Sequence, residues 1–260
     1  MRNYGRRRSV DSWELIRQKQ CDKVLVLGHR GSPLRERENT IPSFLRALQE
    51  GADGVELDVR VTKDKVLVVS HDNSLKRVFG LDMKIEDSNF QEIKDKAPEI
   101  PTLAEVFSAL GPVWYDIEIK ADKPLGFPKE VVTLLSEELE RRKEFQNRIL
   151  LSSFNPFAMR KIGKLTANRF PMGIIYSGKG SSVPVFCRRG QGRFAFRCSF
   201  LKPKYDIAPR ERRNKKKWPL CPWTVDSSEE VRRMVALNVP IIITNDPEKV
   251  IRTLQEDRRR

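Results

Sequence analysis

Short apolar runs rich in β-branched residues recur along the chain and alternate with stretches whose apolar residues have helical spacing. This alternation predicts parallel strands joined by helices, which is the pattern of an α/β fold. The expected strands are residues 24–27, 54–59, 66–70, 113–119, 149–152, 172–176, 205–208, 221–225 and 241–244. The expected helices are residues 40–50, 102–110, 129–143, 156–165, 227–237 and 247–255.

Nine expected strands are one too many for a (β/α)8 barrel of the TIM type. Only six residues, 60–65, separate the second and third strands, whereas a parallel crossover needs about a dozen. One of those two strands is therefore expected to pair antiparallel or to leave the barrel. Segments 72–98 and 177–217 fit the alternation poorly and are expected to be insertions or long loops.

A chain of 260 residues with 39% hydrophobic residues is expected to form one barrel domain. We place this domain at residues 24–254, between a basic N-terminal extension, 1–23, and a basic C-terminal tail, 255–260. No apolar run approaches the roughly 18 residues that cross a membrane, and the basic N-terminus is not followed by an apolar signal segment. A cytoplasmic location is therefore expected. The four scattered cysteines are expected to be free thiols.

The formal net charge is +15, from 50 basic and 35 acidic residues. Such an excess favours polyanions, anionic membrane surfaces or phosphorylated substrates as partners, and charge alone does not choose among them. We expect a small-molecule substrate, a weak contact with an anionic membrane surface and no specific nucleic acid. The sequence does not indicate an oligomeric state.

The chain contains only two histidines, His29 and His71, and each directly follows an apolar run that reads as a strand. The carboxyl ends of the strands hold the active site in an alternating barrel. A single histidine is more often structural, but two at equivalent positions favour catalysis. An imidazole also suits acid and base chemistry near neutral pH.

Glu56 and Asp58 leave the same face of one expected strand, while their neighbours Val55, Leu57 and Val59 are apolar. Two carboxylates held this close repel each other unless a cation lies between them. Glu118, near the end of the next parallel strand, is the best candidate for a third ligand. Three carboxylates predict one divalent cation, Mg²⁺ or Ca²⁺.

Two basic residues lie beside these groups. Arg30 follows His29 and provides the planar fork that binds phosphate oxygens. Lys120 shares a strand face with Asp116 and Glu118, so it would bind a phosphate or form an ion pair with one of those carboxylates. The metal, Arg30 and Lys120 would together face one anion.

Ten short motifs carry a resemblance to a known family. They are, in order, GHRG at 28–31, ENT at 38–40, GADGVELDV at 51–59, TKD at 62–64, VSHD at 69–72, IPTL at 100–103, EIK at 118–120, SSF at 152–154, WTV at 223–225 and ITNDP at 243–247. With these motifs the chain closely resembles the glycerophosphodiester phosphodiesterase family, from about residue 24 to about residue 250. The basic segment 177–217 matches little of the family pattern.

The resemblance implies a barrel related to (β/α)8, with His29 and His71 as acid and base and Glu56, Asp58 and Glu118 as metal ligands. It also implies hydrolysis of glycerophosphodiesters to glycerol 3-phosphate and an alcohol. Trp223 is a candidate to pack against the glycerol group or simply to belong to the core. Two alternatives are a lysophospholipase D acting through the same centre, and a non-catalytic barrel that binds polyanions or membranes.

Overall fold

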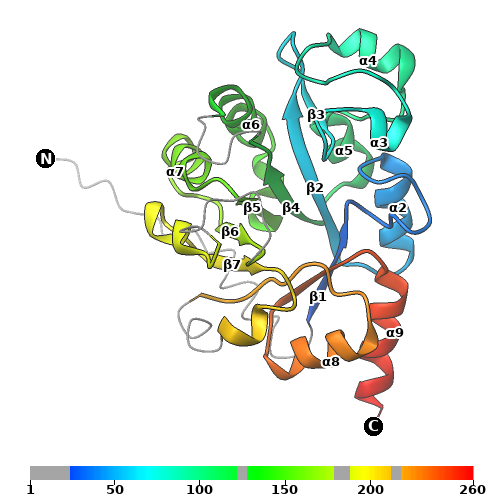
Figure 1. Ribbon diagram of the computed structural model, residues 1–260, viewed down its shortest axis with the longest axis vertical. Helices are drawn as coiled ribbons and strands as arrows, with labels where there is room; N and C mark the ends of the chain where they lie inside the picture. The colour runs from blue at the N-terminus through cyan, green and yellow to red at the C-terminus, as the bar shows by residue number, and fades with distance from the viewer. Residues whose placement is uncertain (1–23, 122–127, 179–187, 212–217, 260) are drawn as a thin grey trace, which may run out of the picture.

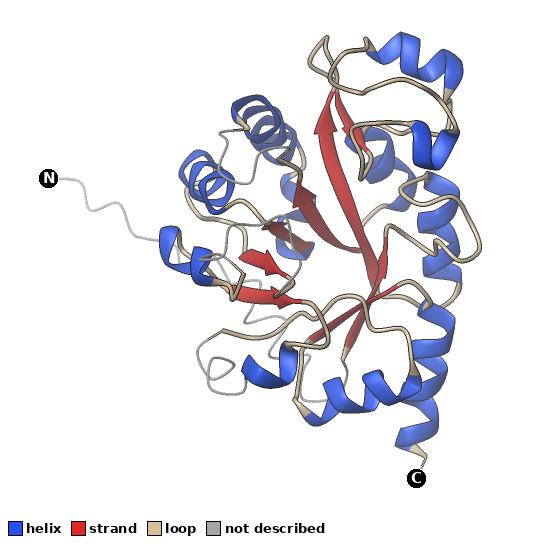
Figure 2. Cartoon of the chain, in the orientation of Figure 1, coloured by secondary structure: helices blue, strands red, loops and turns tan. Residues whose placement is uncertain are grey.

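The structure, a computed structural model, describes residues 24–121, 128–178, 188–211 and 218–259. Within these residues, seven parallel strands form one curved sheet in the spatial order β7-β6-β5-β4-β2-β1-β8. Helices lie outside the strands (Figures 1 and 2). The strands are β1 (Leu25–His29), β2 (Gly54–Val61), β4 (Trp114–Ile119), β5 (Ile149–Ser153), β6 (Met172–Tyr176), β7 (Phe200–Pro203) and β8 (Ile241–Thr244). The expected α/β barrel is therefore confirmed.

The strand expected at 66–70 is β3 (Leu67–Val69), which pairs antiparallel with the end of β2. Val59 lies opposite Val69, and Val61 lies opposite Leu67. The short connection between the two strands allows a hairpin but no crossover helix. The sequence prediction that one of these strands departs from the parallel order is correct.

Residues 220–225 occupy the gap between β7 and β8. Cys221 N donates to Leu201 O at 2.8 Å on one side, and Val225 N donates to Ile243 O at 2.9 Å on the other. Pro219 and Pro222 have no N–H group, so this segment forms isolated bridges instead of a regular ladder. The strand expected at 221–225 thus lies in the barrel wall without regular strand structure.

The prediction of a strand at 205–208 was wrong. Those residues form a turn that leads into the 3₁₀ helix η4 (Ala208–Glu211), and the true strand, β7, lies within the segment expected to be an insertion. Lys202 interrupts the apolar run of β7, and Pro203 ends it. A buried lysine at an inward position is what obscured the strand in the sequence.

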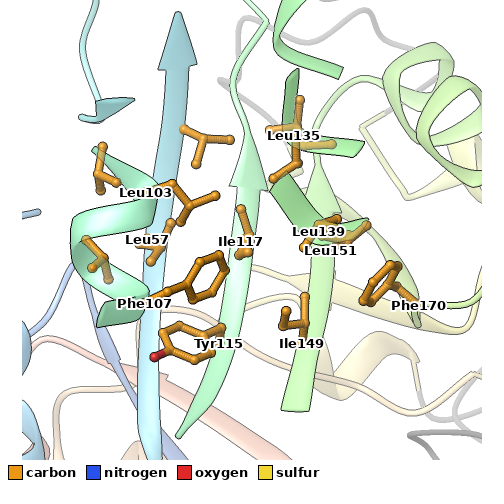
Figure 3. Packing of buried hydrophobic residues seen from close by; sticks show 14 of the residues in the cluster. Leu57, Leu103, Phe107, Tyr115, Ile117, Leu135, Leu139, Ile149, Leu151 and Phe170 are labelled. Atoms are coloured by element: carbon orange, nitrogen blue, oxygen red, sulfur yellow. The ribbon is translucent and has the colours of Figure 1, made fainter. Parts of the chain in front are cut away.

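The barrel interior has two layers. Its lower layer is an apolar cluster from strands β1, β4, β5, β7 and β8 and from residue 221, with Leu25, Leu27, Trp114, Leu150, Phe200, Cys221, Ile241 and Ile243. Its upper layer is charged and carries the candidate site. The outward side chains of the strands form a separate core with the helices, in which Leu57 and Ile117 pack beside Leu103 and Phe107 (Figure 3).

The outer helices are α2 (Ile41–Gln49), α5 (Leu103–Leu110), α6 (Lys129–Arg141), α7 (Pro156–Leu165), α8 (Ser228–Ala236) and α9 (Pro247–Arg258). Thr40, Thr102 and Ser227 cap the first turns of α2, α5 and α8, because each hydroxyl accepts a backbone N–H bond. Helix α9 continues three residues past its expected end. None of the helices in the described ranges has both the length and the apolar composition that a membrane crossing requires.

Residues 72–98, expected to be an insertion or a long loop, form a small lobe. The lobe contains α3 (Lys76–Phe79) and α4 (Phe90–Lys96) and stands beyond the end of β2 and β3 (Figure 1). Its apolar side chains form a cluster with Val68 of β3 and with Ile100; the members from the lobe are Leu75, Ile85, Ile93 and Ala97. The lobe is therefore a packed structure that holds a fixed position at the carboxyl end of the barrel.

Gly54 of β2 lies against the backbone of β4, and this contact predicts the effect of one substitution. A Cβ atom at Gly54 would lie 2.0 Å from the carbonyl oxygen of Trp114, and that backbone is fixed inside the sheet. We expect Gly54→Ala to lower the free energy of unfolding by about 2 kcal/mol or more in urea denaturation. The control is Ser108→Ala, at an exposed position of α5, for which we expect a change below about 0.5 kcal/mol. An equally small change for Gly54→Ala would contradict the described β2–β4 contact.

Candidate active site

Four carboxylates line the upper layer of the barrel interior on two neighbouring strands. The parallel register places Glu56 of β2 beside Asp116 of β4, and Asp58 beside Glu118. All four residues are buried. The alternation of strand side chains puts them on the inner face, while Val55, Leu57 and Ile117 point outward into the helical core.

Glu56, Asp58 and Glu118 form a compact donor set. Each offers one carboxylate oxygen, and the three oxygen atoms lie within 4.8 Å of one another. Buried carboxylates at this spacing repel unless positive charge compensates them. A set of three oxygen donors fits a hard divalent cation, so the ligand set expected from the sequence is spatially consistent.

Three basic side chains also compensate these carboxylates. Lys120 Nζ lies 2.6 Å from Glu118 Oε1 and 2.9 Å from Asp58 Oδ1. Lys202 Nζ lies 3.0 Å from Glu56 Oε1 and 2.9 Å from Asp116 Oδ2. Arg30 Nε lies 3.4 Å from Asp58 Oδ2. Four carboxylates against these three cations leave one negative charge when all are ionised, which favours the uptake of a further cation.

Asp58 is strongly stabilised in its ionised form. Burial alone would raise the pKa of its carboxyl, but Lys120 and Arg30 outweigh burial and hold the pKa far below the ordinary value. Asn39 adds a hydrogen bond from Nδ2 to Asp58 Oδ2 at 2.8 Å. Asn39 has a positive φ of 57°, a conformation that asparagine adopts more readily than most residues. Asp58 is thus a fixed anion.

Arg30 is held at the rim of the site by Glu38. Arg30 NH1 donates to Glu38 Oε1 at 2.9 Å, and the backbone N of Arg30 donates to the backbone O of Glu56 at 2.9 Å. Burial opposes the charge of Arg30, but Asp58, Glu56 and Glu38 raise the pKa of its guanidinium above the ordinary value. Glu38 and Asn39 lie in the ENT motif at 38–40, which precedes helix α2. Both residues position site groups, whereas Thr40 caps the helix.

The ring of His29 is oriented by a chain of polar groups from the end of β8. His29 Nδ1 lies 2.7 Å from Asn245 Oδ1, and Asn245 Nδ2 donates to Asp226 Oδ2 at 2.8 Å. Because the amide nitrogen is committed to Asp226, its oxygen accepts from His29, and the proton of the neutral ring resides on Nδ1. His29 Nε2 then faces the acidic cluster, 3.9 Å from Glu56 Oε2.

The ring of His71 is oriented by a carboxylate. His71 Nδ1 lies 2.7 Å from Asp72 Oδ1, and Asp72 Oδ2 accepts from Arg77 Nε at 2.6 Å. Arg77 also donates to both oxygens of Glu38, at 2.6 and 2.8 Å. Glu38 binds Arg30, so the lobe residue Arg77 connects the supports of His71 and Arg30.

Comparisons with known proteins identify the family of the chain. The profile of the Glycerophosphoryl diester phosphodiesterase family matches residues 29–249. A glycerophosphodiester phosphodiesterase of Caldanaerobacter subterraneus is 32% identical over 90% of this chain and 99% of that protein. The chain belongs to this family. A solved structure of the Thermotoga maritima glycerophosphodiester phosphodiesterase is 30% identical, with a TM-score of 0.73, covering 88% of this chain and 98% of that one. Human lysophospholipase D GDPD1 is 33% identical over 42% of this chain and 40% of that protein.

The structure of this family member places the site residues predicted from the sequence at one end of the barrel. They are His29, Arg30, Glu56, Asp58, His71, Glu118 and Lys120, with Trp223 beside them. Trp223 lies beside the site, where its indole N–H donates to Lys202 O at 3.1 Å and its ring meets Phe154 edge-on at 5.9 Å. Sequence reasoning missed Lys202, Asn245 and Asp226. Asn245 and Asp246 follow the last strand, which was a usable signal, whereas nothing local marked Lys202 as buried.

The environment of His71 predicts its titration. Burial is the largest cause that lowers the pKa of His71, and Lys120 and Arg30 lower it further, against the raising effects of Asp58 and Asp72. We expect the metal-free protein to show a pKa for His71 below the ordinary 6.5 in an NMR titration of the imidazole signals. Only two histidines are present, so His29→Ala assigns the spectrum. A value above 6.5 would show that Asp58 and Asp72 dominate instead.

Proposed function

We propose that this chain hydrolyses glycerophosphodiesters to glycerol 3-phosphate and an alcohol, with His29 and His71 as the acid and base. The observation that carries the proposal is the shared orientation of the only two histidines in the chain. Each ring is held at Nδ1 by an oxygen, from Asn245 or Asp72, which leaves Nε2 available beside a charged cluster. This arrangement supports proton transfer at two points of one substrate.

The binding of the phosphate falls to Arg30 and Lys120. Both side chains are cationic and lie at the edge of the carboxylate cluster, within reach of an anion that enters from the open end of the barrel. Their charges would stabilise the non-bridging oxygens as negative charge grows in the transition state. A divalent cation held by Glu56, Asp58 and Glu118, Mg²⁺ or Ca²⁺, would supply Lewis-acid polarisation of the phosphoryl group.

The two histidines divide the proton transfers. One Nε2 accepts a proton from the nucleophile, and the other, protonated beforehand, gives its proton to the departing alcohol oxygen. The nucleophile is either water, which gives glycerol 3-phosphate directly, or a glycerol hydroxyl, which gives a cyclic phosphate that water then opens. Asn245 and Asp72 keep both rings in the required tautomer throughout, because each accepts from Nδ1–H. Glu38 holds Arg30 in place while these transfers occur.

A second candidate function is the removal of the head group from lysophospholipids by the same chemistry. The similarity to human lysophospholipase D supports it, and the half-buried Phe154–Trp223 pair offers an apolar surface beside the site. This function would need an apolar groove for an acyl chain, for which the Phe and basic residues of segment 177–200 are candidates. That segment lies partly outside the described residues, because residues 179–187 are not described. The net charge of +15 supports a weak contact with anionic membranes, and the cytoplasmic location stays a prediction.

Hydrolysis assays test both functions. We expect purified protein to release glycerol 3-phosphate from glycerophosphocholine with added Mg²⁺ or Ca²⁺, and to lose turnover in chelator. His29→Ala, His71→Ala and Glu56→Gln are each expected to lower kcat at least 100-fold. The surface variant Lys76→Ala should retain full activity. Preferred turnover of lysophosphatidylcholine would select the second function. No turnover of any diester by folded protein, with binding to polyanions that survives chelation, would support a non-catalytic barrel instead.

Leaving-group chemistry assigns the two histidines. A glycerophosphodiester of p-nitrophenol has a leaving group that departs without protonation. The variant that lacks the general acid should therefore recover most of its activity on this substrate, whereas the variant that lacks the general base should not. Equal loss for both variants on both substrates would contradict the division of proton transfers.

A further inference from the structure

Lys202 is the most deeply buried cationic side chain in the described part of the barrel, and the chemistry proposed above does not use it. It is 1% exposed and projects inward from β7. The spatial order of the strands separates β7 from β2 by three strands, so Lys202 reaches across the barrel to Glu56. A lysine in such a position is costly unless its charge is fully compensated.

The surroundings of Lys202 provide that compensation. Its ammonium lies 3.0 Å from Glu56 Oε1, 2.9 Å from Asp116 Oδ2 and 3.2 Å from Ser152 Oγ. Ser152 in turn donates to Asp116 Oδ1 at 2.8 Å. Burial alone would lower the pKa of Lys202, but Asp116 and Glu56 outweigh burial and raise it above the ordinary value. The side chain is therefore a permanent cation with three oxygen partners.

The contact with Glu56 has a directional consequence. Glu56 Oε1 is taken by Lys202, whereas Oε2 faces the backbone N of Arg30 at 3.3 Å and His29 Nε2 at 3.9 Å. Glu56 is thus held from both sides in one orientation. We propose that Lys202 is a positioning residue that fixes the Glu56 carboxylate for cation binding, while Asp116 and Ser152 anchor Lys202 itself.

This role explains why the two carboxylate pairs differ. Glu118 and Asp58 are compensated by Lys120, which is partly accessible at the mouth of the site. Glu56 and Asp116 are compensated by Lys202, which is enclosed by the wall. A substrate anion can meet Lys120 but not Lys202. The buried lysine therefore acts on the reaction through Glu56 alone.

The test uses a pair of double variants with unchanged net charge, Lys202→Met with Asp116→Asn and Lys202→Gln with Asp116→Asn. Both remove the Lys202–Asp116 ion pair together, so that no unpaired carboxylate remains at residue 116. Glu56 loses its ammonium partner in both variants, and only the glutamine retains a donor for it. Titration calorimetry with Mg²⁺ and Ca²⁺ is expected to show about 10- to 100-fold weaker binding for the methionine variant and partial recovery for the glutamine variant. Thermal unfolding and circular dichroism establish that both are folded.

Two further readouts separate positioning from simple filling of the barrel. In crystal structures, the Glu56 carboxylate should leave its described orientation in the methionine variant and regain it in the glutamine variant. Turnover, which rests on the proposed function, should show a lower kcat with KM changed less than threefold. Lys204→Met, which removes a half-exposed lysine two residues along the chain, is the control and should match the wild type.

The outcomes are distinguishable. Wild-type cation affinity together with an unmoved Glu56 in a folded methionine variant would overturn the proposal and make Lys202 a structural residue only. A wild-type protein that binds no cation and hydrolyses no diester would refute the proposed function. The orientation of Glu56 in the paired crystal structures would still decide whether Lys202 positions it.

Discussion

Charge balance inside the barrel is the constraint on which the site depends. Parallel pairing of β2 with β4 places Glu56 and Asp58 beside Asp116 and Glu118, so four carboxylates meet in a space from which water is largely excluded. Lys202, Lys120 and Arg30 offset much of this charge. The remaining negative charge and the open arrangement of three ligand oxygens suit a divalent cation. An apolar layer lies beneath and keeps the charged layer at the carboxyl end of the strands.

The orientation of both histidine rings is set by the polar residues around them. His29 is held by Asn245, which directly follows β8 and is itself held by Asp226. His71 is held by Asp72. Both arrangements orient a ring by its Nδ1 atom, although one acceptor is a neutral amide and the other is a carboxylate. The two acceptors therefore differ in charge while both rings are held at the same atom, which fits the acid and base roles proposed for them.

The lobe formed by residues 72–98 contributes to this order. The lobe packs against β3 through an apolar cluster that includes Val68 and Leu75. Arg77 of α3 lies between Asp72 and Glu38 and donates hydrogen bonds to both. One side chain thereby joins the support of His71 to the support of Arg30. The segment expected to be an insertion or a long loop thus supports the rim of the site, because its apolar side chains pack together with Val68 of β3 and with Ile100.

The sequence by itself determined the alternating α/β order, the antiparallel β3 and the residues that meet at the site. Those features are local: apolar runs, the short 60–65 link, and polar residues that directly follow strands. The prediction from the apolar pattern misplaced β7, because Lys202 and Pro203 interrupt that pattern. It also made 221–225 an ordinary strand, although the prolines there prevent a regular ladder. Only the tertiary structure decided that Lys202 meets Glu56, that Arg77 meets Glu38 and that Asp226 supports Asn245. These contacts join residues far apart in the chain, and local patterns carry no record of which charges will face each other across a closed barrel.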